Sequence, residues 1–272
     1  MSLQSSDPII IPNNANSFLN TVQATLPPAG TGRRLGQDVN HAVISVEHKL
    51  NTVRFMAGLI QNIDEAAFSE FERHLLQSQS GIPHLGTPQQ STHTRFLERA
   101  EFTMYDLKEY RLFLMFFLEA FSAGATGLLD NCAFILERLF SLQMQEKDIT
   151  FIRVLDQSKI KNSNLYGFLK KYKENESNNE PWVNPLKQIR NRTSHRPITE
   201  VCGLMENERT LYSSPPPVEF VLNQEMFPPN TSPSERNLKS FVESCFHGLV
   251  DFVEEFYISL SQEIQSSGTL PF

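Results

Sequence analysis

Residues 39–60 read VNHAVISVEHKLNTVRFMAGLI, and the spacing of their apolar positions decides the fold. Apolar residues recur at alternating steps of four and three, which keeps them on one face of a long helix. They are Val39, Val43, Val46, Leu50, Val53, Ala57 and Ile60. This seam is typical both of a bundle helix that packs on a neighbour and of a coiled-coil dimer, for which about three heptads are the minimum. We favour the bundle helix.

Helical spacing dominates the chain beyond this segment. A second helix is expected over residues 64–77, and the helical pattern resumes near Thr94 and runs past Ser141. Gly124 and Gly127 lie within this long stretch, where they mark either a kink or a close contact between helices. The pattern therefore predicts long helices in this part of the chain.

The last helix has the clearest start signal. Ser232-Pro-Ser-Glu235 combines a serine for the N-cap, a proline at the first helical position and the glutamate of a capping box. Apolar residues then recur at helical spacing from Leu238 to Leu260. Residues 200–227 depart from this pattern, because two short apolar runs flank Pro215-Pro-Pro217 in the manner of a β-hairpin.

These elements predict a mainly α fold. We expect a helical bundle with long antiparallel helices and a small β-hairpin-like excursion near residues 200–227. Residues 1–32 are expected to form a loose N-terminal arm, residues 33–266 a single helical bundle domain, and residues 267–272 a tail.

The composition is that of an ordinary globular protein. The chain has 272 residues, of which 40% are hydrophobic and 20% charged, and a net charge of −7. Its three cysteines lack the C-x-x-C spacing of a zinc ribbon, and it has no phosphate-binding or dinucleotide-binding glycine motif. The first residues lack the features of a signal peptide, and Glu119 interrupts the apolar run 112–129. We therefore expect a cytoplasmic protein that does not enter the membrane.

Positive charge is concentrated in residues 151–198. This segment contains ten lysines and arginines against four acidic residues, a net charge of +6, whereas the remainder of the chain carries −13. A concentrated basic surface can hold a polyanion even on an acidic protein, although an ordinary solvated surface has the same composition. The residues within the segment favour a binding surface.

The stretch 182–197, WVNPLKQIRNRTSHRP, combines an apolar helix face with a cation and an imidazole. The apolar residues share one side of a helix that Pro197 ends at or just after His195. Arg190 and His195 then lie about 7–8 Å apart along the helix axis. Cleavage of a phosphodiester needs a proton carrier and a cation that stabilises the charge developing on the phosphate. These two side chains would supply both.

Arg190-Asn191-Arg192-Thr193-Ser194-His195 resembles the R-x4-6-H motif of HEPN (higher eukaryotes and prokaryotes nucleotide-binding) domains, including the polar residue after the arginine. HEPN domains are all-α bundles that carry the motif on a late helix. The resemblance implies a metal-independent endoribonuclease, in which a histidine assists attack by the ribose 2′-OH on the adjacent phosphate. It implies that His195 is the acid–base catalyst and that Arg190 holds the phosphate. Asn191 would orient the side chain of either His195 or Arg190.

The resemblance also implies partners. HEPN ribonucleases act as homodimers whose two motifs meet in a shared cleft, and many serve in defence or stress response beside an antitoxin-like regulatory partner. RNA is then the expected ligand, and we expect the nearby cations to bind it: Lys187, Arg192, Arg196, Lys170 and Lys171. No cofactor or metal is expected. His41 and His48 share a helix face at a spacing of seven, which is more typical of solvated residues than of a metal pair.

Two other interpretations of the motif remain open. The same residues suit a non-catalytic site for nucleic acid or for a protein partner, and an arginine and a histidine at a helix C-terminus also serve as plain caps. For the whole chain, the competing function is a helical protein-interaction module without catalysis. Cleavage of RNA by the purified protein separates these interpretations.

Overall fold

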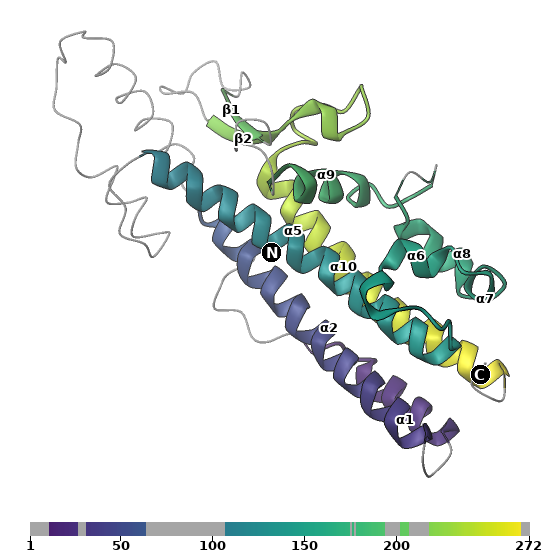
Figure 1. Cartoon of the computed structure of the whole chain (residues 1–272). Coiled ribbons are helices and arrows are strands. Elements are labelled where there is room, and N and C mark those ends of the chain that lie inside the picture. Colours follow the sequence, from purple (N-terminus) through teal and green to yellow (C-terminus); the bar gives the residue numbers. More distant parts are fainter. Residues whose placement is uncertain are drawn as a thin grey trace, which may run out of the picture. The chain divides into compact units, whose positions relative to one another are not determined.

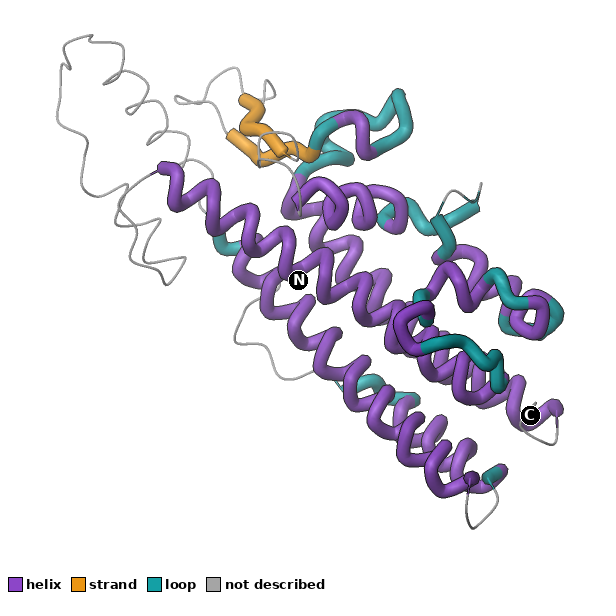
Figure 2. Tube along the Cα trace, in the orientation of Figure 1, coloured by secondary structure: helices purple, strands orange, loops and turns teal. Residues whose placement is uncertain are grey.

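The computed structural model describes residues 11–26, 31–63, 107–174, 176, 178–193, 202–206 and 218–267. Helices dominate these residues, which confirms the mainly α prediction (Figures 1 and 2). The expected helix over 64–77 and the start of the long helix near Thr94 lie outside the described residues.

The α-helices are α1 (Ala15–Thr25), α2 (Thr31–Gln61), α5 (Leu107–Phe140), α6 (Phe151–Leu155), α7 (Ser158–Lys161), α8 (Tyr166–Leu169), α9 (Val183–Thr193) and α10 (Leu238–Ser267). The 3-10 helices are η1 (Glu146–Asp148), η2 (Lys170–Tyr172) and η4 (Gln224–Met226), and the strands are β1 (Cys202–Glu206) and β2 (Val218–Leu222). Within the described part of the chain, no helix has the length and apolar character needed to cross a bilayer.

The chain forms two compact units. Unit 1 comprises residues 1–7, 54–121 and 188–244. Unit 2 comprises residues 8–53, 122–187 and 245–272. Helices α2, α5, α9 and α10 each contribute residues to both units.

The apolar seam of α2 is buried within the chain itself. All of its members are at most 1% exposed: Val39, Val43, Val46, Leu50, Val53, Ala57 and Ile60. A seam buried in this way cannot serve as the contact surface of a coiled-coil dimer. The bundle-helix interpretation is therefore confirmed.

In unit 2, α2 and α5 run side by side and antiparallel (Figure 1). Near one end of the pair, a Cβ atom at Gly124 would lie 3.0 Å from the Val53 side chain, and near the other, Arg138 Nε lies 3.7 Å from Asp38 Oδ2. From the first contact to the second, the residue number rises along α5 and falls along α2, as antiparallel packing requires. Because α5 continues without interruption, Gly124 and Gly127 mark a close helix contact and not a break.

Helix α1 lies within the stretch expected to be a loose arm. Its Phe18 ring stacks on Tyr257 of α10 with centroids 5.2 Å apart. The Glu254 carboxylate accepts hydrogen bonds from the backbone N–H groups of Asn13 at 2.7 Å and Asn14 at 3.2 Å. The expectation of a loose arm therefore fails for α1, because an aromatic contact and a carboxylate hold it on α10.

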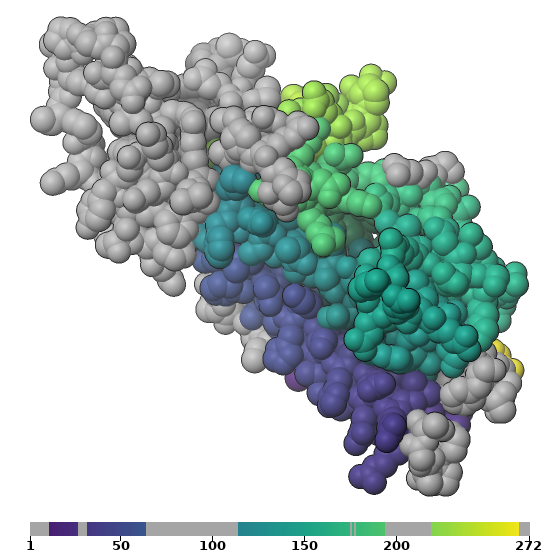
Figure 3. All heavy atoms as spheres, viewed as in Figure 1, coloured from purple at the N-terminus to yellow at the C-terminus, as the bar shows by residue number. Residues whose placement is uncertain are grey.

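Aromatic rings join α10 to the short helices of unit 2. The Phe252 ring of α10 lies 4.6 Å from Tyr172, 5.7 Å from Phe168 and 5.8 Å from Phe151, centroid to centroid. The Asp130 carboxylate of α5 accepts a hydrogen bond from the Phe151 N–H at 2.9 Å, where α6 begins. Helices α6 and α8 are thereby attached to α10, and this part of the chain faces the viewer in the space-filling view (Figure 3).

In unit 1, β1 and β2 pair in antiparallel fashion. The register runs from Cys202 opposite Leu222 to Glu206 opposite Val218. This pairing confirms the hairpin-like excursion expected near residues 200–227.

Helix α10 begins five residues later than the capping box indicated, at Leu238 instead of Pro233. The box itself forms, since Glu235 Oε2 accepts the Ser232 N–H at 2.7 Å, but it closes an isolated turn. The N-cap of α10 is Asn237, whose side-chain oxygen accepts the Ser240 N–H at 3.0 Å. The physical reason is a contact with β2, because the Leu222 N–H donates to the carbonyl just before Asn237 at 2.9 Å. The Arg236 carbonyl is thus bonded to the strand, and the helix starts only after this residue.

Candidate functional site

Helix α9 carries the motif and has two different faces. Trp182, which directly precedes the helix, is buried together with Leu186 and Ile189. Arg190 and Asn191 are exposed. Buried positions at steps of three and four place one side of the helix in the protein and leave the other in solvent. The sequence-predicted faces of this helix therefore match the observed burial.

The start of α9 is held in unit 2 by Trp182. The indole ring lies 5.9 Å from Tyr172, which in turn contacts Phe252 of α10. The indole also lies against Gly248 of α10, where a Cβ atom would be 2.9 Å from Cε2. Side chains in close-packed interiors do not approach so closely without displacement. This contact therefore depends on a glycine at position 248.

The last described turn of α9 belongs to unit 1. Thr193 is buried, and its hydroxyl donates to the Ile189 carbonyl at 2.9 Å. Arg190 and Asn191, in the same turn, are exposed. His195 and Arg196 lie outside the described residues, so their relation to Arg190 stays a prediction.

Two cations of α9 are paired with carboxylates from other elements. Lys187 forms an ion pair with Glu174, and Arg192 Nη2 donates to Glu225 Oε2 at 2.9 Å. Glu174 precedes Lys187 by 13 residues, and Glu225 follows Arg192 by 33. No local spacing rule connects residues so far apart, so sequence reasoning did not identify these acids.

The two lysines of η2 differ in their surroundings. Lys170 Nζ lies 3.2 Å from Glu176 Oε2. Lys171 is exposed, and within the described part of the chain no carboxylate pairs with its side chain. Of the lysines expected to bind RNA, Lys171 is thus the one whose charge is least compensated.

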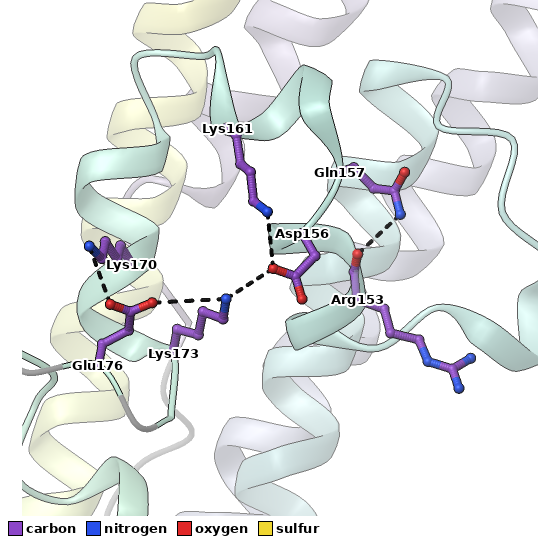
Figure 4. A network of polar contacts seen from close by, with 7 residues as sticks. All are labelled: Arg153, Asp156, Gln157, Lys161, Lys170, Lys173 and Glu176. Atoms are coloured by element: carbon purple, nitrogen blue, oxygen red, sulfur yellow. Dashed lines mark hydrogen bonds and ion pairs between the residues drawn. The ribbon is translucent and has the colours of Figure 1, made fainter.

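Figure 4 shows that Asp156 is the centre of a polar network on unit 2. Its carboxylate lies 2.9 Å from Lys173 Nζ and 3.3 Å from Lys161 Nζ. Hydrogen bonds from Lys173 and then Lys161 lower the pKa of Asp156, and the Asp156 carboxylate in turn raises the pKa of Lys173. Both charges are thereby maintained near neutral pH, and much of the positive charge of this segment is compensated within the protein.

Other cations of the segment also have internal partners. Lys159 Nζ donates to the Phe140 carbonyl at 2.9 Å, at the C-terminus of α5, where a positive charge also suits the helix dipole. Arg153 forms an ion pair with Asp148. Asp148 and Glu225, which pairs with Arg192, lie outside residues 151–198, so the net charge of +6 read from that segment overstates the charge that is available to a polyanion.

The described residues contain no cluster of three or more histidine, cysteine, aspartate or glutamate side chains suited to a metal ion. His41 and His48 are exposed on α2. Cys132 and Cys245 are buried, and burial raises the pKa of both thiols. A buried thiol with a raised pKa is a poor nucleophile, so neither cysteine suits covalent catalysis.

Comparison with protein families matches residues 55–214 to the family described as Cthe2314-like HEPN. The match covers more than half of the chain, including α5 through α9 and the residues of the motif. No curated protein and no solved structure gives a significant match.

Proposed function

Because the chain belongs to the HEPN family, whose members are generally associated with ribonucleases, we propose that it is a metal-independent endoribonuclease. The observation that supports this most is the exposed Arg190 on a helix that Trp182 and Ile189 anchor in the protein. Because the helix is anchored, the backbone that carries Arg190 is held in place, and a guanidinium can bind a phosphodiester through two parallel hydrogen bonds. Asn191, exposed beside it, can orient Arg190 or His195.

The proposed reaction uses the ribose itself as the nucleophile. His195 removes the proton from the 2′-OH, whose oxygen then bonds to the adjacent phosphorus. The bond from phosphorus to the 5′ oxygen breaks, and that oxygen takes up a proton, which the motif of a second copy supplies in the proposed homodimer. The products are a 2′,3′-cyclic phosphate and a 5′-OH. Arg190 stabilises the extra negative charge on the phosphate as it forms.

The surrounding cations are proposed to bind the RNA backbone. Lys171 is the most available, while Lys170 and Lys187 would exchange their carboxylate partners for phosphates, and Arg196 follows the motif. Each such exchange replaces one ion pair by another, so it contributes less affinity than an uncompensated lysine. We expect modest affinity with a clear dependence on salt.

Cleavage of single-stranded RNA in the presence of a chelator tests the proposal. The wild type should cut, His195→Ala and Arg190→Ala should abolish cutting, and Asn191→Ala should slow it. Arg153→Gln is the matched control, because Arg153 is an exposed arginine paired with Asp148 and outside the motif. Cutting by both motif variants would contradict the assignment.

A folded wild type that neither cuts nor binds RNA would favour the competing function, a protein-interaction module. A role in defence or stress response and an antitoxin-like partner remain part of the proposal by analogy with the family. The mass of the protein in solution tests the homodimer.

A further inference from the structure

The two arginines of the motif helix lie on different sides of it. Arg190 and Arg192 are two residues apart, which places them about 200° apart around the helix axis. Arg190 is exposed, whereas the side chain of Arg192 retains an exposure of only 14%. A phosphate held by Arg190 is therefore beyond the reach of Arg192 on the opposite side.

We infer that Arg192 is a positioning residue and not an RNA contact, an assignment that rests on the proposed ribonuclease function. Arg192 Nη2 donates to Glu225 Oε2 at 2.9 Å. Glu225 belongs to η4, and its own side chain is 71% exposed. The more covered partner of this ion pair is thus the arginine, and its guanidinium is already held by a carboxylate of the same chain.

The 3-10 helix η4 is a firm attachment point. The Asn223 side chain caps it by accepting the Glu225 N–H at 3.1 Å. Met226 is buried, and the Phe227 ring meets Phe241 of α10 edge to face with centroids 6.0 Å apart. These contacts fix the backbone that carries the Glu225 carboxylate.

The strand before η4 is attached to the residues that lead into α10. The Leu222 N–H donates to the Arg236 carbonyl, and Arg236 Nη1 donates back to the Leu222 carbonyl at 2.6 Å. The Asn237 side chain donates to Glu219 at 2.8 Å. We name β2, η4 and residues 236–241 the η4 platform. All of it lies in unit 1, together with the last turn of α9.

The ion pair therefore connects the motif end of α9 to the η4 platform. At the same turn, Ile189 and Thr193 are buried, and the Thr193 hydroxyl donates to the carbonyls of Ile189 at 2.9 Å and Arg190 at 3.3 Å, bonds that are internal to α9. Without the pair, the turn that carries Arg190 and leads to His195 would have more freedom. The cations that bind phosphate would remain, so the loss should affect the rate of the chemical step more than the affinity for RNA.

The test compares Arg192→Gln, Glu225→Gln and the double variant with the wild type and with the control Arg153→Gln. We measure kcat, KM, the salt dependence of RNA binding, and amide hydrogen exchange of residues 188–193. Each single variant should lower kcat by on the order of ten- to a hundredfold, with KM and the salt dependence unchanged. The double variant should be no slower than either single variant, because both remove the same pair. Exchange should be faster in all three, and Arg153→Gln should match the wild type.

Two results would contradict this assignment or the function on which it rests. Arg192→Gln could reduce the slope of log K for RNA binding against log salt concentration by about the amount that one phosphate contact contributes. If Glu225→Gln also leaves kcat unchanged, Arg192 binds RNA directly and the assignment fails. If the wild type does not cut RNA, the ribonuclease proposal fails separately. Amide exchange then decides the assignment alone: unchanged exchange in both single variants overturns it, and faster exchange in both supports it.

Discussion

The indole ring of Trp182 lies against the backbone of Gly248, in space that any side chain at position 248 would need. A Cβ atom there would stand 2.9 Å from Cε2 of the indole and closer still to Nε1. The helix that carries the motif is thus positioned partly by the absence of a side chain on α10.

Gly248→Ala should displace Trp182 and destabilise the fold by about 1–3 kcal/mol, the usual cost of overpacking. Trp182 is the single tryptophan of the chain, so its fluorescence reports the displacement directly. Gly167→Ala is the control, because nothing lies within 4 Å of a Cβ atom at that helical position. Equal melting temperatures and emission spectra for Gly248→Ala and the wild type would contradict this packing.

Leu50→Ala should cost about 2–5 kcal/mol, because Leu50 is fully buried in the α2 seam. The loss should be independent of protein concentration, since the seam is covered by the same chain. His48→Ala, on the exposed side of α2, should change stability by less than about 0.5 kcal/mol. A melting temperature of the Leu50 variant that recovers with protein concentration would instead indicate an intermolecular seam.

Glu254→Ala should release α1 from α10. The carboxylate accepts two backbone N–H groups and the Asn14 side-chain amide, the last at 2.7 Å. Hydrogen bonds to a charged group contribute about 1.5–3 kcal/mol, so limited proteolysis or hydrogen exchange should show faster opening of residues 11–25. The neighbouring exposed Glu255 supplies the control as Glu255→Ala. Protection of α1 that is the same in both variants would refute this role.

Asp156 should make stability depend on acid pH. Because its lysine partners lower its pKa in the folded protein, Asp156 contributes stability above its ordinary value of 3.8, and this contribution is lost as the pH falls through the lower folded pKa. Asp156→Asn should therefore be less stable than the wild type near neutrality, and the difference should shrink below pH 3.8. Denaturant titrations from neutral to acid pH measure it, with the exposed Asp251→Asn as control. A difference that is constant with pH would exclude the network as its source.

The parts of the fold that follow from local periodicity were predictable from sequence. The α2 seam and the buried side of α9 follow from spacing along one helix, because burial of an apolar face imposes that spacing. The start of α10 was misplaced because a tertiary bond from Leu222 to Arg236 decides it. A capping box shows where a turn closes, and the contact with β2 determines where the helix starts.

The candidate site was predictable only in part for the same reason. Arg190 and Asn191 were identified from the motif and are exposed as expected. The Glu225 carboxylate that pairs with Arg192 comes from outside residues 151–198, so the net charge of that segment overstates what RNA would meet. Contacts between residues far apart in sequence depend on how the helices pack.

The attack of the 2′-OH is the centre of this account, and one oligonucleotide tests it. An RNA strand with a single deoxyribose at a mapped cleavage position, incubated with the wild-type protein and a chelator, should stay intact at that position. It should be cut as before at its other positions, leaving 2′,3′-cyclic phosphate ends. Cutting on the 3′ side of the deoxyribose would contradict the proposed mechanism, because no 2′-OH is present there to attack.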